Sequence, residues 1–187
     1  MKIPTMLMLA ALGAASSGAI AQTDATPAKR TASEQTAHTG EKISAADFVK
    51  KAAAAGHAEV AMGKLGAEKA TNAAVKAFAQ KMVTDHTKAN KELATIASTK
   101  KLEVPTEPDL IHKGMQEKFE HQSVDKDFHH DFMQQMVRDH EAAVELFGNA
   151  AHDATLDIDV RTFANKTLPT LKQHLAAAKK LEAKLAK

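Results

Sequence analysis

Two copies of one short motif each end in a histidine. Residues 82–86 read MVTDH and residues 136–140 read MVRDH, and in both copies a phenylalanine stands four residues before the methionine. Neutral imidazoles and carboxylates are ligands of zinc, copper and other borderline metal ions, and a metal site needs several of them at one point. The repeat therefore raises two possibilities for His86 and His140, which are metal binding and simple packing.

Helical spacing adds two more ionisable residues to this pair. Steps of four and three residues along each predicted long helix trace a seam of small and apolar side chains. Each seam contains one ionisable residue, and the four are Glu59, His86, His140 and His174. Within each pair of consecutive helices, the two residues lie at nearly equal distances from the connecting turn. We therefore expect the four side chains to meet near the middle of the folded domain.

Three interpretations of this set stay open. Burial of a carboxylate or imidazole without a partner costs about 1–3 kcal/mol or more, so the four should satisfy one another or share a ligand. The first interpretation is a metal site, in which three imidazoles and one carboxylate hold a divalent or cuprous ion, zinc or copper. The second is a Glu–His network without metal that only fixes the register of the helices. The third is a hydrolase, which requires an open coordination position and a substrate cleft.

Neighbouring residues could support the set. Asp85 and Asp139 directly precede two of the histidines and lie about 100° around the helix from them, so they either orient an imidazole of another helix or remain solvated. We favour the solvated position for both. Met82 and Met136 lie about one turn from the same histidines, and thioethers suit Cu(I), although methionine at helical spacing is more commonly core filler. Six other histidines are expected at surface or helix-end positions without function: His57, His112, His121, His129, His130 and His152.

The elements that must position these residues are helices. Apolar residues recur with helical periodicity, and no competing run alternates as a strand would. Four long helices packed side by side predict an all-α four-helix bundle. The connection 100–122 is long enough to carry the chain back along the bundle, which would make the second and third long helices parallel. Pro169 is expected to kink or divide the last helix. The predicted helical segments are 45–70, 72–99, 109–121 after Pro105 and Pro108, 123–153 with Ser123 as its cap, and 157 to the C-terminus.

Three parts of the chain follow from composition. Residues 1–21 have a lysine near the start, an apolar run and small residues before Gln22, as in a secretory signal peptide. Residues 22–43 are polar and predict a disordered linker, and residues 44–187 form the bundle domain. The chain has no cysteine, so neither disulfides nor a lipidated cysteine is expected. We expect an exported protein, in the periplasm or secreted, without a transmembrane segment.

Charge and aromatic content narrow the function classes. The formal net charge is +2 and no basic run follows a nucleic-acid backbone, which argues against a nucleic-acid partner. The chain has no tyrosine, the side chain most used as a one-electron relay, and this argues against oxygen chemistry. A non-enzymatic metal-binding bundle fits best. The alternative is a structural or stress-related protein with a partner in the cell envelope.

Three stretches of the sequence resemble one family of exported bacterial proteins, domain of unknown function 4142, often labelled an outer membrane protein family. They are DFVKKAAAAGHAEVAMGKLGAEKATNAAVKAFAQKMVTDHTKAN, FMQQMVRDHEAAVELF and FANKTLPTLKQHL. The resemblance implies a ferritin-like bundle and carries over Glu59, His86, His140 and His174 as motif positions, but it implies no reaction. Ferritin-type diiron sites use E-x-x-H pairs, whereas the residues three before the histidines are Val83, Val137 and Leu171. A diiron centre is therefore not expected.

Overall fold

The computed structural model describes residues 42–186. The predicted signal peptide, 1–21, and most of the predicted linker, 22–41, lie outside the described residues. Ile43, the last residue of that predicted linker, packs against the hydrophobic core.

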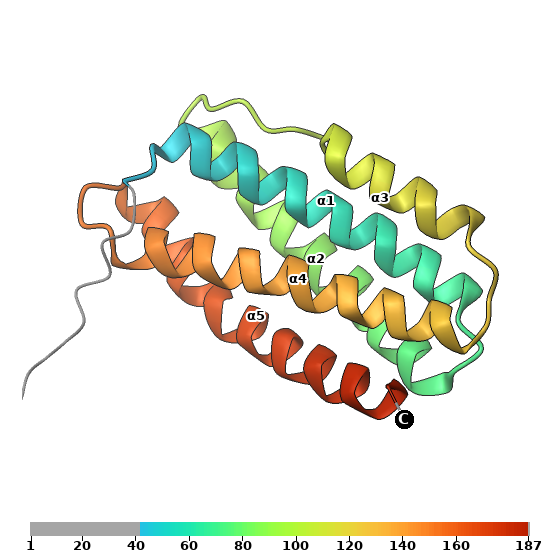
Figure 1. Ribbon diagram of the computed structural model, residues 1–187. Coiled ribbons are helices and arrows are strands. Elements are labelled where there is room, and N and C mark those ends of the chain that lie inside the picture. Colours follow the sequence, from blue (N-terminus) through green and yellow to red (C-terminus); the bar gives the residue numbers. More distant parts are fainter. Residues whose placement is uncertain (1–41, 187) are drawn as a thin grey trace, which may run out of the picture. The chain divides into compact units, whose positions relative to one another are not determined.

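Five helices and no strand make up the described part of the chain (Figure 1). The predicted all-α class, with four long helices and one short helix between the second and the third of them, is confirmed. In chain order the helices are α1 Ala45–Lys69, α2 Ala73–Thr99, α3 Leu110–His121, α4 Lys126–His152 and α5 Ile158–Leu185. None of these five is both long and apolar enough to cross a membrane.

Side-chain caps fix where the helices begin. Ser44 and Asn72 cap α1 and α2, as the sequence predicts, by accepting hydrogen bonds from backbone N–H groups of the first turn. The predicted start of α4 is wrong, because its cap is Asp125 and not Ser123. The Asp125 carboxylate accepts a hydrogen bond from the backbone N–H of Phe128 at 2.9 Å, and this sets the first helical residue at Lys126.

Contacts at the helix ends show how the two hairpins are joined. Near the start of α2, the backbone N–H groups of Thr71 and Asn72 lie 3.1 and 3.2 Å from Nε2 of His129, close to the start of α4. At the other end, Lys100 forms ion pairs with Asp157 and Asp159 at the start of α5. Helices α2 and α4 are therefore parallel, the direction that the long connection allows but does not by itself decide. This is the one-crossover arrangement of ferritin-like bundles.

The short helix α3 runs along α1 on the outside of the bundle (Figure 1). Its end is held by Lys69, whose ammonium donates hydrogen bonds to the backbone carbonyls of Phe119, Glu120 and Gln122 at 2.6–2.9 Å. Phe119 is fully buried and contacts Phe128 and Phe132 edge to face. The crossover is thus anchored at its far end.

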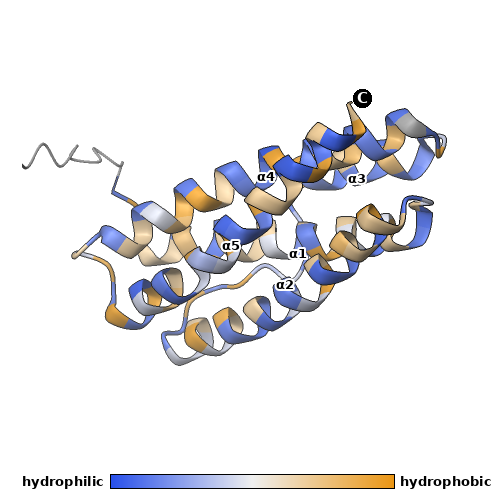
Figure 2. Cartoon of the chain, turned by 90° about the horizontal axis from the view of Figure 1, so that it is seen from below, coloured by the Kyte–Doolittle hydropathy of each residue, from blue (hydrophilic) through white to orange (hydrophobic). Residues whose placement is uncertain are grey.

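The hydrophobic core has two halves. One half contains Phe48, Phe147 and Phe163 and gathers the first part of α1 with the last parts of α2 and α4. The other half is richer in methionine and phenylalanine, and it includes Met62, Met82, Met133, Met136 and Phe132. Hydrophobic residues form stripes along the helices, between stripes of hydrophilic ones (Figure 2). The four seam residues lie at the level between the two halves, where the sequence predicts them.

Helix α5 is continuous through Pro169. The predicted alternative of a division into two segments is wrong. Buried Leu168 and Leu171 pack against the core on either side of the proline. This burial offsets the backbone hydrogen bond that proline cannot donate.

Candidate metal site

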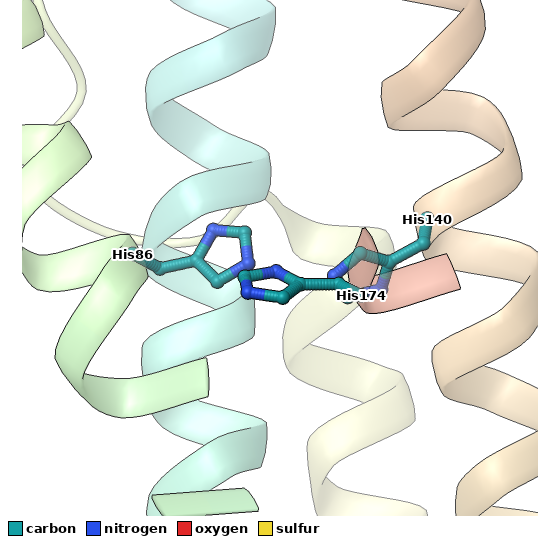
Figure 3. A group of neighbouring side chains, drawn as sticks. All are labelled: His86, His140 and His174. Carbon is teal, nitrogen blue, oxygen red and sulfur yellow. The ribbon is translucent and has the colours of Figure 1, made fainter. Parts of the chain in front are cut away.

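Three histidines from three helices meet at the centre of the bundle. His86 comes from α2, His140 from α4 and His174 from α5, and their rings point toward one another (Figure 3). Each offers a ring nitrogen, and the three nitrogens lie within 4.8 Å of one another. The ring centroids are 5.4–5.5 Å apart. All three side chains are buried, and His140 is completely inaccessible to solvent.

Hydrogen bonds define which nitrogen is free in two of the three rings. Nδ1 of His140 lies 2.8 Å from the carbonyl oxygen of Met136, which can only accept, so Nδ1 carries the proton. Nε2 of His174 lies 2.8 Å from the Asp85 carboxylate and donates to it in the same way. Their other nitrogens, with Nε2 of His86, are buried and have no hydrogen-bond partner. Each of these nitrogens carries a lone pair or can adopt the tautomer that does, which a metal ion requires.

Burial keeps the imidazoles neutral. It lowers the pKa of His86 to about 3, with a further contribution from the neighbouring His140 and His174. Burial also lowers the pKa of His140 to about 4 and the pKa of His174 below its usual value. Neutral imidazole is the form that binds metal ions, so no proton has to be displaced near pH 7.

Glu59 lies next to the three histidines but on another side of His140. Its Oε1 is 3.4 Å from Nδ1 of His140, the protonated nitrogen, while Oε2 is buried without a hydrogen-bond partner. Burial, with the nearby charge of Asp139, raises the pKa of Glu59 well above its usual range. The structure thus brings the predicted four residues together as three convergent imidazoles and one carboxylate behind His140.

The two aspartates that precede the histidines differ. The predicted solvated position is wrong for Asp85, which accepts hydrogen bonds from both His174 and Lys81. Burial raises the pKa of Asp85, but these hydrogen bonds outweigh it and leave the pKa below its ordinary value. Asp139 contacts no histidine of the site; it accepts a hydrogen bond from Gln135 and is half-buried. The difference arises because α5 passes beside Asp85, which the spacing within α2 does not reveal.

The two methionines of the repeat are fully buried in one half of the core. The backbone of Met136 also takes part in the site, because its carbonyl fixes the tautomer of His140. His129 lies at the start of α4, one of the two positions expected for it, but its side chain is buried and accepts hydrogen bonds from the N–H groups at the start of α2. It satisfies donors that a helix start leaves without partners.

A pocket of about 220 Å³ reaches the site from the half of the core that contains Phe147 and Phe163. Its inner end includes Glu59 and His86, and residues at the start of α3, Asp109 and His112, also line it. The sequence predicts only a surface or helix-end position for His112, and nothing in it singles out Asp109 as a site residue. No local signal identifies them, because only the crossover brings α3 to this place.

The sequence of this chain matches the model of one protein family. A family model described as "Domain of unknown function (DUF4142)" matches residues 14–181, which include every helix except the last turn of α5. The chain belongs to the DUF4142 family. No curated protein and no solved structure matches this DUF4142 chain. The family description assigns no activity, so the geometry of the site has to indicate the function.

The DUF4142 site does not fit a diiron carboxylate centre. Such a centre needs several carboxylates that face the metals. Here the two carboxylates in contact with the histidines, Glu59 and Asp85, approach ring nitrogens that carry protons. Three imidazole nitrogens are a donor set that could hold a single metal ion.

Proposed function

We propose that this DUF4142 protein binds one metal ion, zinc or copper, through Nε2 of His86, Nε2 of His140 and Nδ1 of His174. The observation that carries the proposal is that three converging imidazole nitrogens are buried and have no hydrogen-bond partner. A metal ion would satisfy all three at once. Asp85 would support His174 from behind by accepting the hydrogen bond of its N–H group, a common arrangement around histidine ligands, and the Met136 carbonyl accepts that of His140.

The alternative, a polar network that only fixes helix register, fits the hydrogen bonding less well. Such a network would satisfy its own donors and acceptors, because each buried polar atom without a partner costs about 1–3 kcal/mol. Six buried side-chain atoms have no partner in the described part of the chain, and four of them belong to Glu59, His86, His140 and His174. The unsatisfied atoms are therefore concentrated where a metal ion would bind.

The donor set narrows the metal. Nitrogens bound to one tetrahedral zinc ion at 2.0–2.1 Å stand about 3.4 Å apart, so small rotations of the three rings would complete the site. Three imidazoles suit zinc and copper, whereas magnesium and calcium prefer oxygen ligands. The buried thioethers of Met82 and Met136 lie about one turn from the histidines, and either could favour Cu(I).

Export is the second part of the proposal. The basic and apolar character of residues 1–21 supports a secretory signal peptide and, with it, a periplasmic or secreted protein. Expression of the full chain in a bacterium, followed by fractionation and mass spectrometry of the N-terminus, tests this. A chain that stays in the cytoplasm with residues 1–21 attached would contradict it.

Calorimetric titration of the protein without its signal peptide or a histidine tag tests metal binding. We expect one Zn²⁺ or Cu⁺ per chain, and loss of this binding in the double variant His86→Ala, His174→Ala. His152→Ala is the matched control, because His152 is exposed and bonds only within α4. Equal affinity in the wild type and the double variant would contradict the proposal.

A further inference from the structure

The pocket beside the histidines has mainly apolar walls and a polar inner end. Small residues of three helices leave the space open, and they are Ala52, Ala55 and Gly56 of α1, Ala89 of α2, and Ala142 and Ala143 of α4. At about 220 Å³ the pocket has room for several water molecules. His86 is the only one of the three histidines that lines it. The pocket therefore reaches the site on the His86 side.

Two unsatisfied polar groups face this space. Glu59 Oε2 and His86 Nε2 have no hydrogen-bond partner, and both residues are more than nine-tenths buried and line the pocket. Asp139 lines the same pocket as Glu59. A cation in this pocket would be attracted to Asp139 and would favour the ionised form of Glu59. Asp109 and His112, which pair with each other, offer further ligand atoms in the same pocket.

We infer that this pocket is the route by which the metal ion reaches the three histidines, and that Asp139 and Glu59 bind the ion on the way. The inference rests on the proposed function, because the route serves the three-histidine site. Fewer than three protein ligands converge at Asp139 and Glu59 among the described residues, so the ion retains water there and passes on. Three buried imidazoles bind it more firmly at the end of the route.

The first experiment narrows the pocket and follows the kinetics of Co²⁺, whose visible absorption reports binding to nitrogen ligands. Ala143 is half-buried and lines the pocket, so Ala143→Leu fills part of the route without changing a ligand. Association and dissociation are expected to slow together, by about tenfold or more, with an unchanged dissociation constant. The exposed Ala176, which does not line the pocket, gives the matched control Ala176→Leu.

The second experiment removes the charge of Asp139. In Asp139→Asn the association rate of Co²⁺ is expected to fall by about tenfold at low salt, because a carboxylate in a pocket attracts cations. Glu141→Gln is the control, since Glu141 lies on the same helix, is exposed and does not line the pocket. An equal loss in both variants would mean general attraction to the protein surface and would overturn a role for Asp139.

The outcomes separate the two proposals. A wild-type protein that binds neither Co²⁺ nor Zn²⁺ overturns the proposed function and the route together. If the wild type binds metal and the folded Ala143→Leu variant exchanges it at the wild-type rate, only the route is overturned. Circular dichroism establishes folding, and Ala55→Leu narrows the same pocket from α1 if Ala143→Leu does not fold.

Discussion

Asp85 determines which nitrogen of His174 is free for a metal. Its carboxylate accepts a hydrogen bond from the protonated Nε2 of His174 at 2.8 Å. The same carboxylate forms an ion pair with Lys81 at 2.6 Å. The free Nδ1 then points into the cluster. Carboxylates that accept a hydrogen bond from a histidine ligand orient its ring and increase its basicity.

Replacing Asp85 with asparagine should therefore weaken metal binding. We expect Zn²⁺ affinity to fall by about 10- to 100-fold in Asp85→Asn, the range found for residues behind histidine ligands. Asp131→Asn is the control, because Asp131 accepts a side-chain hydrogen bond from Gln122 and contacts no histidine of the site. Competition titration against a chromophoric chelator measures both variants. An affinity loss in Asp131→Asn as large as in Asp85→Asn would argue against a specific role for Asp85.

The buried histidines should make the stability of the metal-free protein depend on pH. The pKa values of His86 and His140 fall from 6.5 to about 3 and about 4 on burial. The unfolded chain thus binds more protons below pH 6.5, and the free energy of unfolding declines as the pH drops from 6.5 toward 4. Each histidine contributes up to about 1.4 kcal/mol per pH unit in this range.

Urea denaturation in the presence of a chelator, at several pH values, measures this decline. Replacement of His86 by leucine should flatten the slope between pH 6.5 and 4, whereas His152→Ala should not. The raised pKa of Glu59 acts in the opposite direction, because the folded state keeps a proton that the unfolded chain releases above pH 4.5. Glu59 is present in all three proteins. An unchanged slope in His86→Leu would mean that His86 is already protonated in the folded state.

At the scale of the helices, glycine sets how closely α1 approaches its neighbours. A Cβ atom on Gly66 would lie 2.5 Å from Cζ of Phe132 on α4 and 3.0 Å from Cβ of Ala79 on α2. Real Cβ atoms do not approach other atoms so closely. Helix α1 therefore has to carry glycine at this point of the core.

Replacement of two glycines by alanine should have opposite effects on the free energy of unfolding. Gly66→Ala should lower the free energy of unfolding by about 1–3 kcal/mol, because Phe132 would have to move in a tightly packed core. Gly148→Ala in α4 meets no atom within 4 Å and should raise it by up to about 1 kcal/mol, because alanine favours the helix. Urea denaturation at pH 7 distinguishes them. A neutral Gly66→Ala would show that α1 and α4 are less tightly packed than in the structure.

At the scale of the whole molecule, the three histidines connect both hairpins. One ion bound by α2, α4 and α5 would join the α1–α2 hairpin to the α4–α5 hairpin at mid-height. A ligand that binds only the folded state stabilises it by mass action. Metal should therefore stabilise the complete bundle, not only one helix.

Zn²⁺ at a hundred times its dissociation constant should add about 2.7 kcal/mol of stability. This corresponds to a rise in melting temperature of about 5–10 °C for a domain of this size. Mg²⁺ is the control, because it prefers oxygen ligands. If the Glu–His network is purely architectural, Zn²⁺ should not change the melting temperature of the wild type. The His86→Ala, His174→Ala variant should show no change under either interpretation. Differential scanning calorimetry of both proteins decides between the two interpretations.

Much of this arrangement could be predicted before the structure, because it depends on local periodicity. The level at which Glu59, His86, His140 and His174 meet follows from 1.5 Å of rise per residue in straight helices. The residue at which α4 starts and the role of His129 could not be predicted. Both depend on competition among nearby caps and on the position of another helix start.

The amino-acid sequence by itself determined the helices and the seam positions, because helical period decides them. The length of the connection allowed a parallel crossover, but the contacts at the helix ends decided it. Only the tertiary structure decided how the four seam residues divide. Rotation of α1 relative to α4 places Glu59 against the protonated nitrogen of His140, and α5 brings His174 onto Asp85. The pocket lined by small residues beside the start of α3 also follows only from the tertiary structure. Distances between side chains on different helices depend on how the helices pack, and spacing along one chain does not specify that.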